Sequence, residues 1–89
     1  MSLFRRNKSV DLEEVFKTKY KEINKIIADG QNELDLQIQI SLFTLAYEKY
    51  NDLLGLIDQG VEYDRKHFEA LQKDLKKQID LLKGLENEN

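Results

Sequence analysis

The chain has 89 residues and a formal net charge of −3, and it contains no proline, cysteine or tryptophan. Apolar residues make up 40% of it and charged residues 35%, which excludes a disordered chain and a membrane protein and leaves room for one domain. The lack of cysteine excludes a disulfide scaffold and a thiolate zinc site. The first residues lack the apolar core of a secretory signal, so we expect a cytoplasmic protein.

Glycines divide the chain into segments. Gly30 and Gly60 each follow an apolar periodic segment, at the position after a helix where a left-handed backbone favours glycine. We therefore expect a single helical domain over residues 10–85, preceded by a flexible basic tail (1–9) and followed by an acidic disordered tail (86–89). The predicted helices span about residues 10–28, 32–58 and 62–85.

The first and third predicted helices each carry one apolar stripe at helical spacing, which is typical of helices packed on one side. The first stripe consists of Leu12, Phe16, Tyr20, Ile23 and Ile27. The third helix has Phe68, Leu71, Leu75, Ile79, Leu82 and Leu85. Asp64 is placed to cap this third helix, because Tyr63 before it and Phe68 after it can form a hydrophobic staple.

The second predicted helix carries two apolar stripes on opposite faces. One stripe consists of Leu36, Ile40, Phe43, Tyr47, Tyr50, Leu54 and Ile57. The other consists of Leu34, Ile38, Leu42, Leu45, Leu53 and Leu56. A helix that is apolar on two faces has to be packed on both sides.

The fold class that follows is all-α: an elongated three-helix bundle dominated by a long antiparallel helical hairpin, with coiled-coil-like packing. Net charge agrees with a central second helix, since it is +3 over residues 1–25, −7 over 26–64 and +3 over 65–85. The predicted core consists of Leu12, Phe16, Tyr20, Ile23, Ile27, Leu36, Ile40, Phe43, Leu54, Ile57, Phe68, Leu71, Leu75 and Leu82.

Residues 34–42 also fit the alternating pattern of a half-buried strand. No other segment of the chain alternates, so a strand here would have to pair between two chains. We favour the helix, because the apolar seam runs without a phase break from this stretch into residues 43–57.

The strand alternative carries a function of its own. A strand over residues 34–41 followed by two helices resembles the layout of ribbon-helix-helix transcriptional regulators, which implies an intermolecular ribbon in the major groove of DNA. Gln37 and Gln39 would then face adenine edges. Glu33 and Asp35 would face phosphates and repel them, which favours the helical interpretation.

No residue pattern indicates catalysis, and we expect neither enzyme activity, nor a cofactor, nor a metal. His67 is the single histidine, whereas a zinc site takes three or four nitrogen or sulfur ligands. Carboxylates are plentiful, but general acid–base catalysis needs one held in a pocket.

Basic residues on the tail and the first helix form the candidate nucleic-acid contact, because they could neutralise phosphates along one edge. They are Arg5, Arg6, Lys8, Lys17, Lys21 and Lys25. The acidic protein as a whole, with a pI near 5.1, favours a solvated helix face instead. We expect no membrane contact.

We therefore expect a small non-catalytic protein–protein interaction module, an adaptor, scaffold or inhibitor that pairs with itself as a homodimer and binds an unidentified protein. The candidate interface is Phe43, Tyr47, Tyr50 and Leu54, although the two tyrosines fit an intramolecular core equally well. Short proline-free chains rich in Lys, Asn and Ile are also typical of mobile genetic elements.

Overall fold

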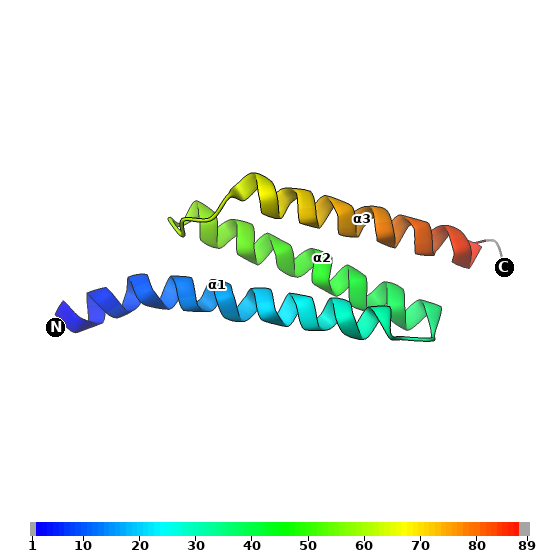
Figure 1. The fold of residues 1–89 in the computed structure, drawn as a ribbon, viewed down its shortest axis with the longest axis horizontal. Coiled ribbons are helices and arrows are strands. Elements are labelled where there is room, and N and C mark those ends of the chain that lie inside the picture. Colours follow the sequence, from blue (N-terminus) through cyan, green and yellow to red (C-terminus); the bar gives the residue numbers. More distant parts are fainter. Residues whose placement is uncertain (1, 88–89) are drawn as a thin grey trace.

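Three long α-helices form where the sequence is apolar at helical spacing: α1 (Ser2–Gln31), α2 (Leu36–Asp58) and α3 (Arg65–Asn87). A computed structural model describes the backbone of residues 2–87 and the side chains of residues 12–87. Within that range there is no strand. The helices run alternately up and down, with α2 between its two neighbours (Figure 1). The predicted all-α three-helix fold is confirmed.

The molecule is long and thin. Its principal extents are 60 × 22 × 13 Å and its radius of gyration is 15.9 Å, against about 12 Å for a compact globule of this length. α1 packs against α2 and α2 packs against α3, while the backbones of α1 and α3 keep apart over the described residues. The predicted elongated shape follows from this arrangement in which each helix pairs with its sequence neighbour.

The connection between α2 and α3 follows the sequence prediction closely. Gly60 has a φ of +116°, which favours glycine. Its N–H donates to Ile57 O, and the Val61 N–H donates to Leu56 O, which together form a Schellman motif that satisfies the last carbonyls of α2. Val61 and Leu56 are both buried, which supplies the apolar contact that accompanies this motif.

Asp64 caps α3 as predicted. Its carboxylate accepts a hydrogen bond from the Lys66 N–H at 3.1 Å. The rings of Tyr63 and Phe68 lie 6.2 Å apart, so the expected staple also forms. Arg65 then ties the start of α3 to the end of α2, since it donates to Leu54 O at 3.3 Å and to the Asp58 carboxylate at 2.7 Å.

Gly30 is not the end of the first helix, which corrects the sequence prediction. It lies inside α1 and is buried. A Cβ atom at this position would lie 2.7 Å from Cε1 of Phe43, so the glycine is needed for the close approach of α2 rather than for a left-handed turn. Gln39 reinforces this contact by donating from its side-chain amide to Gly30 O at 2.8 Å.

The helix bounds also differ from the predicted tails. α1 begins at Ser2 rather than at residue 10, because no glycine or proline interrupts the helix-forming residues before Gly30. α3 continues to Asn87, and residues 88–89 lie outside the described part. Of the predicted tails, residues 2–9 and 86–87 are therefore helical.

The start of α2 decides between the helix and strand interpretations of residues 34–42. The carboxylate of Asp35 accepts from the Ile38 N–H at 3.1 Å and caps a helix that begins at Leu36. The ribbon-helix-helix layout needs a strand there, so the structure contradicts that alternative. The strict alternation of apolar residues arises because this helix is apolar on two faces.

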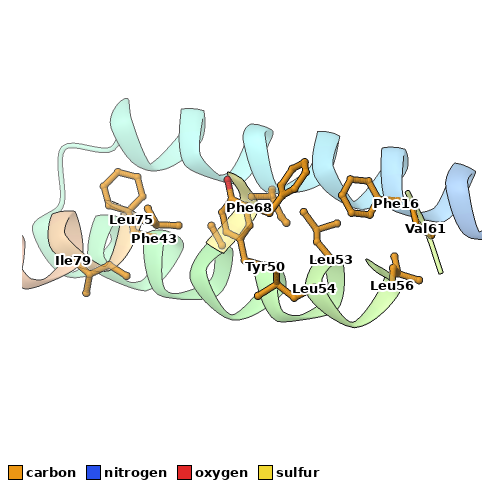
Figure 2. Close-up of a cluster of buried hydrophobic side chains, with 12 residues drawn as sticks. Phe16, Phe43, Tyr50, Leu53, Leu54, Leu56, Val61, Phe68, Leu75 and Ile79 are labelled. Atoms are coloured by element: carbon orange, nitrogen blue, oxygen red, sulfur yellow. The ribbon is translucent and has the colours of Figure 1, made fainter. Parts of the chain in front are cut away.

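Aromatic rings join α1 and α3 across α2. Phe16 and Tyr20 of α1 meet the ring of Phe68 edge-on at 5.1 and 5.3 Å, and Tyr63 stacks on Phe16 at 4.5 Å. Figure 2 shows the surrounding buried side chains gathered along α1 and α2. The buried cluster consists of Phe16, Ile23, Phe43, Ala46, Tyr50, Leu53, Leu54, Leu56, Val61, Phe68, Leu75 and Ile79.

A pair of glycine substitutions tests the close approach of α1 and α2. Gly30→Ala places a methyl group against the buried Phe43 ring, and we expect it to lower the free energy of unfolding by about 1–2 kcal/mol. Gly55→Ala is the matched control, because nothing lies within 4 Å of its new Cβ atom. It should raise stability by roughly 0.5–1 kcal/mol through helix propensity. Urea unfolding of both variants measures the difference, and a stabilised Gly30→Ala chain would contradict the packing argument.

Candidate interaction surface

The most prominent apolar surface lies along the first half of α2. Leu34, Ile38 and Leu45 are 100%, 48% and 42% exposed, and Leu42 between them is half-buried. Ile38, Leu42 and Leu45 recur at steps of four and three, so they share one side of the helix. We call Leu34, Ile38, Leu42 and Leu45 the α2 stripe.

Three of the four residues of the α2 stripe, Ile38, Leu42 and Leu45, lie in the least charged part of the chain, and Leu34 lies just before the start of α2. No charged residue occurs from Leu36 to Tyr47, although charged residues make up 35% of the sequence. A shallow depression of about 390 Å³ adjoins the stripe. It is lined by Asp35, Gln37, Ile38, Ser41, Leu42 and Leu45.

The stripe is exposed because α1 and α3 cover other flanks of α2. On the α1 side, Gln39 reaches Gly30 O and Phe43 packs against Gly30. On the α3 side, the Gln72 amide donates to Tyr47 O at 3.0 Å and to the Asn51 side chain at 2.9 Å. Two neighbours thus occupy two flanks and leave a third uncovered.

The sequence predicts that both apolar faces of the second helix are packed, and within the single chain the second of these faces is packed only in part. Leu53 and Leu56 of the second predicted stripe are buried, as expected. Leu34, Ile38 and Leu45 of the same stripe are exposed. The face is packed near the end of α2, where Phe16 and Val61 close over it (Figure 2), and uncovered near its start.

The predicted interface residues lie in the interior. Phe43, Tyr50 and Leu54 are buried within the single chain, and Tyr47 is half-buried and packs against the core. They are therefore not accessible to a second molecule in this structure. Of the two interpretations that the sequence left open, Tyr50 fits the intramolecular core.

A second hollow of about 280 Å³ runs between α1 and α3 over α2. It is lined by Tyr20, Asn24, Ile27, Gln31, Phe43, Tyr50, Leu71, Asp74, Leu75 and Gln78. Its apolar floor is made of side chains that already pack against this chain's own core, such as Phe43 and Leu75. In contrast, the side chains of the α2 stripe are less buried within the chain than Phe43 and Leu75.

Two exposed leucines stand apart from the α2 stripe. Leu81 and Leu85 are exposed on the last turns of α3, at the end of the molecule where α2 begins (Figure 1). They are separated from each other by one helical turn, and Lys83 lies between them in the sequence. They offer a shorter apolar surface than the stripe.

The candidate nucleic-acid residues are only partly described. Lys17, Lys21 and Lys25 are exposed at steps of four along α1, as the sequence predicted. Arg5, Arg6 and Lys8 belong to the first turns of α1, but their side chains lie outside the described part. The two cross-helix ion pairs of α1 use other residues.

These ion pairs join α1 to α2 at the surface. Lys19 Nζ lies 3.7 Å from the Asp52 carboxylate, and Lys49 Nζ lies 4.0 Å from the Glu22 carboxylate. Both pairs are partly exposed, so each contributes about 0–1 kcal/mol. They agree with the predicted charge pattern without determining the fold.

Titratable side chains are spread over the surface. Between residues 12 and 87 no charged side chain is buried, and His67 is exposed with its ring against the edge of Phe68. Over the same residues, no three His, Cys, Asp or Glu side chains gather in a way that could hold a metal ion. None of the helices within residues 2–87 combines the length and apolarity of a membrane span.

Comparisons with protein-family models, with curated proteins and with solved structures gave no match for this chain. The functional assignment therefore rests on the surface itself.

Tyr50 supplies a test of how the core is packed around α2. Burial, and secondly the neighbouring Tyr20, raise the pKa of Tyr50 from 10 to about 12. The unfolded chain therefore loses this proton at a lower pH than the folded chain. Stability is unaffected below pH 10 and falls as the pH rises from 10 towards 12, by up to about 2 kcal/mol.

We expect Tyr50→Phe to remove this part of the alkaline loss of stability, as measured by urea unfolding between pH 9 and 12. Tyr63→Phe, at an exposed tyrosine, is the matched control and should keep the pH dependence of the wild-type chain. Identical pH profiles for wild type and Tyr50→Phe would show that Tyr50 is not buried in the folded chain.

Proposed function

We propose that this protein is a small non-catalytic helical module for protein–protein interaction, an adaptor, scaffold or inhibitor, which self-associates through an apolar helix face. The observation that carries the proposal is the α2 stripe, in which Ile38 and Leu45 are exposed within a stretch of 12 uncharged residues and Leu34 is exposed just before it. Burial of such side chains is favourable by roughly 25 cal/mol per Å² of apolar area.

The shape of this surface and its polar groups would determine which partner it binds. A rigid helix held by the Asp35 cap and the Gly30–Phe43 contact presents the apolar side chains in fixed positions. Gln37 and Ser41 add uncharged hydrogen-bonding groups beside them. An apolar centre with a polar rim is the usual composition of a protein–protein interface.

The non-catalytic part of the proposal is supported by where the titratable groups lie. General acid–base catalysis needs a group held within a pocket with its pKa tuned by the surroundings. The described carboxylates and His67 are instead at the surface. The proposed function therefore depends on the shape and apolarity of α2.

Light scattering coupled to gel filtration tests the proposal. We expect the wild-type chain to be a dimer and Ile38→Glu to be a monomer, because an unpartnered carboxylate in an apolar interface costs several kcal/mol. At 1.4 kcal/mol per factor of ten, that loss raises Kd by about two orders of magnitude or more.

Leu81→Glu is the matched control, since it introduces the same charge at an exposed leucine on α3. It should leave the dimer intact, and circular dichroism should show unchanged helix content in both variants. A wild-type chain that stays monomeric at every concentration would contradict self-association. A dimer that survives Ile38→Glu would place the contact on another face.

A further inference from the structure

We propose that the α2 stripe is covered by a second copy of this chain, paired antiparallel about a two-fold axis beside Ser41. In this pair Ile38 of each copy lies across from Leu45 of the other, and Lys49 of each copy faces Glu33 of the other. This pairing rests on the proposed function and specifies the partner, the direction of the helices and their register.

The stripe has opposite charges at its two ends. At its start, Leu34 is flanked by the carboxylates of Glu33 and Asp35. At its end, Lys49 follows Leu45 by four residues and so continues the same side of α2. Lys49 is the only basic residue between Ile26 and Asp64, in a segment that is otherwise strongly acidic.

Two-fold symmetry turns these opposite ends into complementary contacts. In an interface about a two-fold axis, the same patch faces itself, so that residue i contacts j and j contacts i. An antiparallel pair brings Glu33 of one copy to Lys49 of the other, twice. A parallel pair would set Lys49 against Lys49 and carboxylate against carboxylate, which is repulsive.

The middle of the stripe permits a close approach of the two helices. The register that sets Ile38 across from Leu45 places the axis between Ser41 and Leu42. Ser41 is small and exposed, and Leu42 is half-buried. Helices with small side chains at the crossing point approach to about 8 Å between axes, which buries the flanking apolar residues.

Lys49 has a long ion pair within its own chain. Its ammonium lies 4.0 Å from the Glu22 carboxylate, at the long end of ion-pair distances, and its side chain is 33% exposed. The nearby carboxylate of Asp52 is already paired with Lys19 at 3.7 Å. In the proposed pair Lys49 exchanges this long, half-exposed contact with Glu22 for Glu33 of the second copy, whose carboxylate also accepts a hydrogen bond from the Asp35 N–H of its own chain at 3.1 Å.

Cysteine cross-linking tests the register. The chain has no cysteine of its own, so a single introduced thiol reports without interference. A disulfide needs Cα atoms closer than about 7 Å, which only residues beside the axis satisfy. We expect Ser41→Cys to give a covalent dimer on mild oxidation. Lys73→Cys, on the exposed surface of α3, is the control and should remain monomeric on a non-reducing gel.

Charge reversal tests the complementary ends. Lys49→Glu alone and Glu33→Lys alone each create two like-charge contacts, and each should weaken self-association by about tenfold. A mixture of the two variants restores both opposite-charge contacts, so the mixed pair should form with nearly the wild-type Kd. Glu22→Gln removes the intrachain partner of Lys49 and should leave the association unchanged.

The outcomes separate this pairing from the proposed function. One outcome would overturn the register but not the proposed function. In that outcome Ile38→Glu abolishes wild-type association, while Ser41→Cys gives no cross-link and the mixed pair shows no recovery. A monomeric wild type would overturn both. Cross-linking at Ser41 together with recovery in the Lys49→Glu and Glu33→Lys mixture would establish the antiparallel pair.

Discussion

The packing of α2 between two helices is the constraint on which the rest of this structure depends. α1 approaches α2 so closely at Gly30 that a methyl group there would overlap the Phe43 ring. α3 is held on another flank by Gln72 and Arg65, whose side chains donate to carbonyl oxygens of α2. Because the backbones of α1 and α3 keep apart over the described residues, α2 lies at the centre of the hydrophobic core.

The same constraint explains why an apolar surface remains. Two helices cover two flanks of α2, and the first part of its second apolar stripe lies on neither of them. Near the end of α2, the Val61 turn and Phe16 complete the cover, whereas near its start the described residues leave Ile38 and Leu45 exposed. A chain that is otherwise rich in charge thus keeps twelve uncharged residues where its apolar surface is greatest.

The sequence correctly predicts features that depend on interactions between residues a few positions apart. Gly60 ends α2 in the left-handed region, and Asp64 caps α3, because both effects are decided within a few residues. Seven of the predicted core residues are buried and most of the others pack against the core. The all-α class and the elongated shape follow from the same periodicity.

Features that depend on tertiary contacts are not predicted from the sequence alone. Gly30 resembles a helix end in isolation, and only the approach of Phe43 shows why a glycine is there. The sequence predicts an interface at Phe43, Tyr47, Tyr50 and Leu54, because periodicity identifies an apolar stripe without saying which helix covers it. The uncharged run from Leu36 to Tyr47 marks the exposed face in the sequence, but apolar periodicity alone does not single it out.

The order of helices in space, α1–α2–α3, is also their order along the chain (Figure 1). Each helix packs against its sequence neighbour, so the loops that must close during folding are short and cost little entropy. Folds dominated by such local contacts reach the native state in microseconds to milliseconds. We therefore expect fast folding, which shortens the time for which the apolar side chains of α2 are exposed in the unfolded chain.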